Sequence, residues 1–278
     1  MSLGSELRAA RTSAGISLAA LGERVGVSAA SLSRWENGRA TPGNDALARV
    51  AGALGLPDST WHAGVDESPS RGPGRPCLVP GSDWRNFEPL QLDPVLAAAL
   101  RMFLARGYHG TTVRDVAKEA SMSVPNVYHY YASKQALLVG VMDRTMVEFR
   151  TRCELAHQEG RDATERFELL VECFALFHSY RRELAFIGAS EMRSLEPVER
   201  ERIAAIRSDC QRMIDIELEA LDRDGRLRTK HRDDAGRAVV TMLVGIANWY
   251  DLDGRQSPDD IARRYVEFAS ELVGLVAS

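Results

Sequence analysis

Residues 103–137 read FLARGYHGTTVRDVAKEASMSVPNVYHYYASKQAL, and they carry the clearest helix signals of the chain. Thr112 and Asp115 stand three residues apart, the spacing of a helix capping box, and introduce the segment VRDVAKEA. A short SMS turn leads to a second segment, VPNVYHYY, after which Ser133 offers a hydroxyl cap for a longer helix. Two short helices joined by a tight turn predict a helix-turn-helix unit.

Helical periodicity extends on both sides of this unit. Before it, Leu96, Ala99, Leu100, Phe103 and Leu104 form one apolar stripe, which ends at Gly107. After it, the chain reads as helices interrupted at EGRD, RSLEP, DRDGRLR and LDGRQSP. Alternation of polar and apolar residues, the mark of half-buried strands, is not found. The fold class is therefore predicted to be all-α.

A second helix-turn-helix pattern lies near the N-terminus, in residues 18–36. Its VGVS turn places Gly26, which tolerates a positive φ, before Ser28, a good N-cap. A further helix is predicted after TPGN, with Asn44 as its cap. Residues 57–91 are rich in Pro, Gly and Ser without periodicity, which predicts a flexible linker. We therefore divide the chain into residues 1–56, 57–91, 92–143 and 144–278.

The charge of the 278-residue chain differs between these segments, although the formal net charge is −4. Residues 1–56 hold six Arg and four acidic residues, and residues 92–143 hold five basic and four acidic residues. Residues 144–278 hold 21 basic and 26 acidic residues, so the acidity lies in the C-terminal half. Because phosphates respond to the local surface charge, an acidic chain is not excluded from binding DNA.

The sequence also indicates in which cellular compartment the protein acts and which kinds of partner are not expected to bind it. Apolar runs stay shorter than the roughly 18 residues that a membrane span needs, and the N-terminus lacks a signal-peptide core. The four cysteines form no C-x-x-C pair, which favours reduced thiols without a zinc site or disulfide framework. We expect a cytoplasmic protein that has no membrane partner.

Residues 92–143 resemble the DNA-binding domain of TetR-family repressors. The resemblance rests on two segments that follow one another in the same order as in that family, FLARGYHGTTVRDVA and VYHYYASKQAL. The resemblance implies a three-helix domain that places residues 124–131 in the major groove of an operator. Ser121 departs from the family, which usually carries Gly in this turn. The DNA contacts that the resemblance implies are Thr112, Pro125, Asn126, Tyr128, His129 and Lys134.

Residues 1–56 resemble helix-turn-helix domains of the Cro and phage-repressor, or XRE, type. The resemblance rests on Arg11, on the Gly15-Ile16-Ser17 entry and on the Glu36-Asn37-Gly38 end, and it implies a five-helix domain with Glu36 facing Arg11. The implied DNA contacts are Ser28, Ala29, Ala30, Ser31, Arg34, Asn37 and Arg39. Leu18, Ala29 and Ala30 replace polar residues common in the family, so docking of another protein is the alternative role.

Residues 144–278 are expected to bind a ligand. The segments FIGASEMRSLEPVERERIAAIR and GIANWYDLDGRQSPDDIARRYVEF resemble TetR-family regulators of fatty-acid and steroid catabolism, several of which bind acyl-CoA. The resemblance implies a hydrophobic effector, with acyl-CoA as one form and a multidrug-type pocket for lipophilic cations as the rival. Arg193 and Arg207 would hold phosphates, while His178 and Asn248 would orient the thioester. The apolar lining would come from Phe174, Phe177, Phe186, Met213, Met242 and Trp249.

The end of the chain predicts a homodimer. Apolar residues recur there at spacings of 4, 3, 4 and 3, which is typical of a helical bundle seam. The preceding residues 239–250 are apolar nearly all round, as a helix buried on several sides should be. The predicted interface residues are Ile261, Tyr265, Phe268, Leu272 and Leu275.

The sequence does not indicate an enzyme. It has no Gly-rich phosphate loop, no nucleophile elbow and no metal-spaced His pair, so we assign no catalytic residue, metal ligand or cofactor. The hypothesis is a DNA-binding transcriptional regulator, a ligand-relieved repressor with two helix-turn-helix units per chain. The alternative is a TetR-type repressor whose N-terminal unit is a protein-interaction module. A nucleoid-type structural protein is disfavoured by the acidic C-terminal half.

Overall fold

The computed structural model describes residues 3–37, 42, 44–56 and 83–276. The regular elements in these ranges are all helical, apart from an isolated antiparallel pairing of Leu227 with Leu275, so the predicted fold class is confirmed. The chain divides into two compact units, Met1–Pro69 and Ser70–Ser278. Gly38, Arg39 and the side chain of Asn44, to which the sequence assigned roles, lie outside the described residues.

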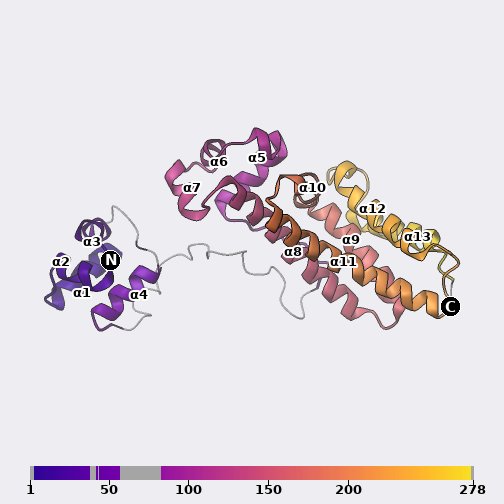
Figure 1. Ribbon diagram of the computed structural model, residues 1–278, viewed down its shortest axis with the longest axis horizontal. Coiled ribbons are helices and arrows are strands. Elements are labelled where there is room, and N and C mark those ends of the chain that lie inside the picture. The colour runs from indigo at the N-terminus through magenta and orange to yellow at the C-terminus, as the bar shows by residue number, and fades with distance from the viewer. Residues whose placement is uncertain (1–2, 38–41, 43, 57–82, 277–278) are drawn as a thin grey trace. The chain divides into compact units, whose positions relative to one another are not determined.

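The first unit packs its described helices around one small core (Figure 1). The helices are α1 (Leu3–Ser13), α2 (Leu18–Val25), α3 (Ala29–Glu36) and α4 (Asn44–Ala53). Gly26 ends α2 with a left-handed φ of 70°, and the Ser28 hydroxyl accepts a hydrogen bond from the Ser31 N–H, so the predicted turn is confirmed. A fifth helix would fall beyond Leu56, outside the described residues. The buried core consists of Leu7, Leu21, Val25, Leu32, Leu47, Val50 and Ala51.

The second unit begins with the predicted three-helix domain. Its helices are α5 (Pro94–Gly110), α6 (Val113–Glu119) and α7 (Val124–Tyr130). The capping box is present: the Thr112 hydroxyl accepts a hydrogen bond from the Asp115 N–H, and the Asp115 carboxylate accepts one from the Thr112 N–H. Ser123 caps α7, and Ser133 caps the helix that follows. Local hydrogen bonds thus set the helix boundaries where the sequence predicted them.

Two residues of this domain hold backbone conformations that side chains disfavour. Gly107 interrupts α5 with φ 69° and ψ 166°, a region that is essentially restricted to glycine. The apolar stripe predicted to end at Gly107 therefore breaks there, and a last turn continues to Gly110. Ser121 has a φ of 54°, and it stands at the turn position where TetR-family repressors usually carry Gly. A left-handed conformation costs a residue with a Cβ roughly 1–2 kcal/mol, so this turn is strained.

The remaining helices form a bundle. They are α8 (Lys134–Glu159), α9 (Ala163–Tyr180), α10 (Arg182–Ser190), α11 (Pro197–Arg223), α12 (Arg232–Trp249) and α13 (Pro258–Val273), with a 3₁₀ turn, η2, over Met192–Ser194. The central helix is α9, which packs against α8, α11, α12 and α13 (Figure 1). The predicted interruptions all fall at helix ends, but the break at Arg181 between α9 and α10 had no Gly or Pro to signal it. Among the described helices, none combines the length and the hydrophobicity that crossing a membrane would take.

The structure corrects the predicted flexible linker over residues 83–91, which we name the strap. Trp84 is buried, and its indole Nε1 donates a hydrogen bond to Glu159 Oε2 at 2.7 Å. Phe87 stacks on Tyr180 of α9, with ring centroids 4.6 Å apart. Two aromatic rings hold this aperiodic, Pro-containing segment on α8 and α9 through the apolar area they bury. The prediction was wrong here because composition alone did not weigh those two rings.

Buried charges also join the strap to the bundle. Arg152 Nη2 and Arg181 Nε donate to the same carboxylate oxygen of Glu148, at 2.8 and 2.9 Å. The side chains of Arg152 and Glu148 are almost fully buried. Arg152 also donates to the Trp84 carbonyl, and Arg181 donates to the Glu88 carbonyl at 2.7 Å. The strap carbonyls are therefore satisfied by guanidinium groups that one glutamate holds in place.

Three cysteines that are distant in sequence meet in the bundle core. Cys153, Cys173 and Cys210 are buried free thiols, and the Sγ atoms of Cys153 and Cys173 are 4.0 Å apart. Burial raises the pKa of the Cys153 thiol well above its ordinary value. Buried structural thiols are chemically inert, so the three cysteines act as core side chains. Cys77 lies outside the described residues.

Candidate functional site

The short helix α7 presents side chains that were predicted to contact DNA. Val127 is fully buried in the core that α7 shares with α5 and α6. Pro125, Asn126 and His129 are exposed, and Tyr128 keeps 49% of its surface accessible. An exposed Tyr and an amide on a helix of this type suit contacts to phosphates and base edges.

Lys134 is the first residue of α8, and its side chain links α8 to the end of α5. Its ammonium donates to the carbonyls of Tyr108 and Thr111, each at 2.9 Å, and lies 4.2 Å from the centre of the Tyr108 ring. An ammonium group has three donors, so a third remains for a phosphate. Thr112, another residue predicted to contact DNA, is exposed at the N-terminus of α6, where its hydroxyl donates to Asp115 at 2.6 Å.

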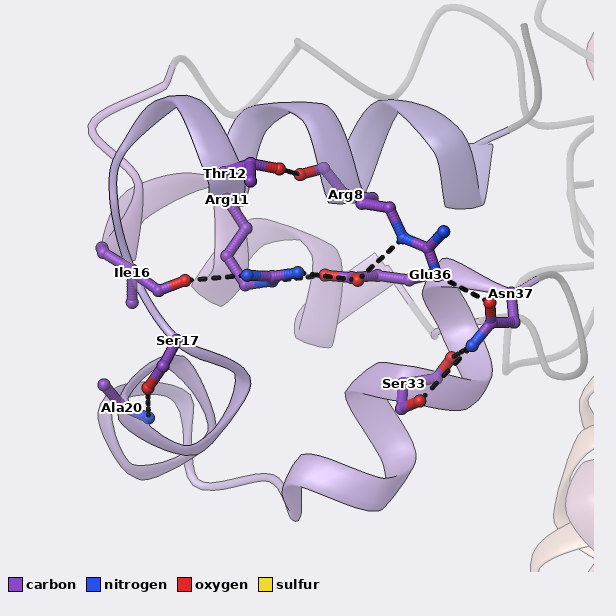
Figure 2. A network of polar contacts seen from close by, with 9 residues as sticks. All are labelled: Arg8, Arg11, Thr12, Ile16, Ser17, Ala20, Ser33, Glu36 and Asn37. Atoms are coloured by element: carbon purple, nitrogen blue, oxygen red, sulfur yellow. Dashed lines mark hydrogen bonds and ion pairs between the residues drawn. The ribbon is translucent and has the colours of Figure 1, made fainter.

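In the first unit, Glu36 links α1 to the end of α3 (Figure 2). Arg11 forms a bidentate pair with its carboxylate, at 2.6 and 3.0 Å, and also donates to the Ile16 carbonyl at 2.9 Å. Hydrogen bonding by Arg11 lowers the pKa of Glu36. The predicted Arg11–Glu36 pair is present. The sequence reading missed Arg8, whose Nε lies 3.4 Å from the same carboxylate.

The exposed face of α3 carries the other residues predicted for the first unit. The hydroxyls of Ser28 and Ser31 are 2.9 Å apart, and the exposed Arg34 donates to Ser31 at 3.3 Å. Ala30 is exposed and Ala29 is half-buried.

Asn37 is already bonded within the first unit. Its side-chain oxygen accepts a 2.6 Å hydrogen bond from Arg8, and its side-chain nitrogen donates to the Ser33 carbonyl at 2.7 Å (Figure 2). Among the described residues predicted to contact DNA in this unit, Arg34 keeps a long exposed side chain, whereas the side chain of Asn37 is already bonded to Arg8 and Ser33.

A cavity of about 340 Å³ lies among α8–α12 and η2 in the second unit. Of the predicted ligand contacts, Phe174, Phe177, His178 and Arg207 line it. The other lining residues are Thr145, Met146, Phe149, Ala185, Gly188, Met192, Ala204, Ser208, Gln211, Val240 and Val244. The set combines an apolar wall with a few polar groups, which is typical of small-molecule sites.

Six predicted ligand contacts do not line this cavity. Phe186, Met213 and Met242 are partly buried residues that pack against the core. Asn248, Arg193 and Trp249 are exposed on the surface, Trp249 by 53%. The sequence shows which residues are large and apolar, but the rotation of each helix decides whether a given ring faces the cavity.

An aromatic cluster forms one wall of the cavity. Phe149, which the sequence reading missed, lies 4.7 Å from both Phe174 and Phe177 and 5.5 Å from His178, measured between ring centroids. His178 Nδ1 bonds to the Phe174 carbonyl at 2.7 Å, so this nitrogen carries the proton. Burial, opposed by that hydrogen bond, lowers the pKa of His178 to about 4, and the charge of Arg207 lowers it further. His178 is therefore neutral at pH 7, with Nε2 as an acceptor.

The neutral His178 predicts an acid-sensitive fold. Its folded-state pKa of about 4 lies below its ordinary value of 6.5, so its contribution to stability is present above pH 6.5 and is lost as the pH falls towards 4. Between pH 7 and pH 5 we expect this residue alone to cost about 2 kcal/mol of unfolding free energy. Urea titrations at both pH values should show this loss in the parent and a smaller loss in His178→Asn. Equal losses in the two proteins would contradict the assignment.

The predicted dimer residues separate into two groups. Phe268 and Leu272 of α13 are exposed, Phe268 by 50%. Tyr265 lies between Trp249 and Phe268, with ring centroids 6.5 and 5.9 Å away. Ile261 and Leu275 do not belong to this surface.

The prediction that Ile261 lies in the dimer interface was wrong, because this residue is buried in the core of its own subunit. Leu275 also packs against that core and pairs with Leu227. Ile261 lies on the inward face of α13, whereas Leu275 follows the Gly274 cap beyond the last residue of that helix, so the spacing of a continuous helical seam does not extend to Leu275.

Three protein families match this chain. Residues 95–141 match bacterial regulatory proteins of the tetR family, and residues 160–273 match the tetracyclin repressor-like C-terminal domain. Residues 2–62 match a helix-turn-helix domain. The first two matches cover the three-helix domain and most of the bundle, and the third covers the first unit.

Individual proteins show the same likeness. The fatty acid metabolism regulator protein of Bacillus subtilis (strain 168) is 25% identical over 112 residues, which are 40% of this chain and only 58% of that relative. A tetR-family regulatory protein from Rhodococcus RHA1 has a crystal structure with 28% identity, covering 66% of this chain and 97% of that one, with a TM-score of 0.62. FadR from Bacillus subtilis, in complex with stearoyl-CoA, is 20% identical, covers 66% of this chain and 98% of that one, and has a TM-score of 0.53.

Proposed function

Because the chain belongs to the TetR family of bacterial regulatory proteins and carries an additional N-terminal helix-turn-helix domain, we propose that it is a repressor released from its operator by a small molecule. The observation that carries this proposal is the exposed face of α7, in a domain where Lys134 of α8 donates to the carbonyls of Tyr108 and Thr111. The functional units are residues 1–56, 92–143 and 144–278, with the strap as part of the last. Such a regulator would act in the cytoplasm by binding double-stranded DNA rather than by catalysis.

Tyr128→Ala tests the role of α7. Tyr128 is half-exposed, so its removal should leave the fold intact and weaken operator binding by about 10-fold, as loss of a positioning contact does. Operator fragments selected from genomic DNA by the parent protein serve as the probe in a mobility-shift titration. Arg114→Ala, an exposed change on α6, is the control. Unchanged affinity of Tyr128→Ala would place the DNA contact elsewhere.

The cavity is the proposed effector site. Its volume lies near the lower end of the roughly 300–1,000 Å³ typical of small-molecule sites, so it suits an acyl chain better than a whole CoA thioester. One relative is named for fatty acid metabolism, and another was crystallised with stearoyl-CoA. We therefore propose a hydrophobic effector with an acyl chain, either as acyl-CoA, of which only a part would fit the cavity, or as the free acid.

A short connection joins the cavity to the DNA-binding domain. Met192 lines the cavity, and the neighbouring Glu191 accepts a hydrogen bond from the Tyr108 N–H at 3.2 Å. Tyr108 in turn accepts from Lys134 through its carbonyl. An effector that displaces η2 would therefore bias the placement of α6 and α7, provided that it binds the released form more tightly.

The homodimer is proposed to form through the exposed aromatic surface of α12 and α13. Trp249, Phe268 and Leu272 expose apolar area that a monomer rarely leaves contiguous. Phe268→Asp should place a charge in this surface and convert the dimer to a monomer in light scattering at micromolar concentration. Glu271→Gln, an exposed change on the same helix, should remain dimeric. A parent protein with the mass of one chain would contradict the proposal.

A further inference from the structure

Arg207 is a charged residue of the proposed effector cavity, and no carboxylate stands among the described residues that line this cavity. Its Nη1 donates to the Gly188 carbonyl at 2.9 Å. No acidic side chain within the described ranges 3–37, 42, 44–56 and 83–276 forms an ion pair with it. By contrast, Arg152 and Arg181 of the same bundle share Glu148. Burial lowers the pKa of Arg207, which expresses the cost of leaving this cation without an anion.

The remaining lining residues leave that charge uncompensated. Arg207 is the one Arg or Lys among them, and none of them is Asp or Glu. The imidazole of His178 is the other titratable group that faces the cavity, and its Nδ1–H is already bonded to the Phe174 carbonyl. A cavity with a fixed cation and no carboxylate attracts anions and repels cations.

The polar and apolar parts of the cavity come from different helices. Phe149 of α8 and Phe174 and Phe177 of α9 form the aromatic wall. Ser208 and Gln211 follow Arg207 on α11, so donors and acceptors gather on that helix. A ligand with an apolar body and one anionic head matches both parts at once.

We propose that the effector presents an anionic group to the Arg207 guanidinium while its apolar body lies against the phenylalanine wall. The anion is a carboxylate of a free acid or a phosphate of a CoA thioester, which offer the same charge-assisted acceptors. This inference rests on the proposed function, because it assumes that the cavity is the effector site. It excludes the lipophilic cations that a multidrug-type pocket would take.

The test is calorimetric titration of the full-length protein with four compounds of matched chain length: decanoic acid, decanoyl-CoA, 1-decanol and decylamine. We expect decanoic acid, decanoyl-CoA or both to bind at least 10-fold more tightly than 1-decanol and decylamine. Arg207→Gln should weaken the anions at least 10-fold and leave 1-decanol unchanged, which also shows that the variant is folded. Arg212→Gln, an exposed change on the same helix, should alter none of the four affinities.

The outcomes separate the two anion sources and the two proposals. Arg207-dependent binding of the acid identifies a carboxylate at this site, and Arg207-dependent binding of the thioester alone identifies a phosphate. If 1-decanol or decylamine binds as tightly as the acid and the thioester, or if Arg207→Gln leaves the anions unaffected, the inference is overturned while the effector cavity stands. If none of the four binds, the inference and the proposed effector site fail together.

Discussion

Glu148→Gln is expected to lower the free energy of unfolding by about 3–5 kcal/mol, the usual cost of removing one partner from a buried ion pair. The substitution keeps the size of the side chain and removes its charge. Arg152 and Arg181, both nearly buried and both donating to Glu148 Oε1, would then lack their shared counter-charge. The strap would loosen as well, because these guanidinium groups hold the carbonyls of Trp84 and Glu88.

Urea denaturation at one fixed protein concentration measures this loss, since the proposed dimer would be stabilised by mass action. Glu154→Gln is the matched control on the same helix. Its pair with Arg150 is half-exposed, so its loss should cost less than about 1 kcal/mol. A similar, small effect for both substitutions would show that Glu148 does not hold the strap and the bundle together.

A chain that begins at Asp83 is expected to bind the operator about 10²-fold more weakly than the full-length protein and to protect a shorter footprint. Covalent linkage makes binding of the second reader intramolecular, which raises affinity by roughly 10²–10⁴-fold even when the first unit binds weakly alone. The shortened chain begins at Asp83 rather than near Leu92, so that it keeps the strap, whose Trp84 and Phe87 pack into the bundle.

Arg34→Ala in the full-length protein complements the deletion. Arg34 is exposed on α3, so its loss should weaken binding and relax base preference at the outer part of the site without disturbing the Arg11–Glu36 pair. Footprinting and mobility-shift titration under identical salt measure both variants. Unchanged affinity and footprint after the deletion would instead favour the alternative, in which the first unit docks another protein.

Local interactions explain why so much of the helical framework could be predicted. The caps at Ser28, Thr112 and Ser133 join groups three residues apart, and Gly26 adopts its left-handed φ within a single turn. Such contacts depend on neighbours in the sequence, so the pattern of residue types was enough to place both helix-turn-helix units. The Arg11–Glu36 pair, by contrast, was predicted from the resemblance to a family, because the two residues are too far apart in the sequence for local spacing to indicate their contact.

The all-α class, both helix-turn-helix units and the resemblance to the TetR family could be predicted from residue patterns, because each depends on neighbouring residues or on short motifs. Knowledge of how the helices pack was needed to establish that residues 83–91 form a docked strap, that Ile261 faces its own core and that Phe149 rather than Trp249 borders the cavity. These facts depend on how several helices rotate against one another, and a rotation of one helical position changes which face is buried. The same holds for Arg207, whose guanidinium has no carboxylate partner in the part of the chain that the structure describes, because only the packing of the helices shows which groups lie beside a charge.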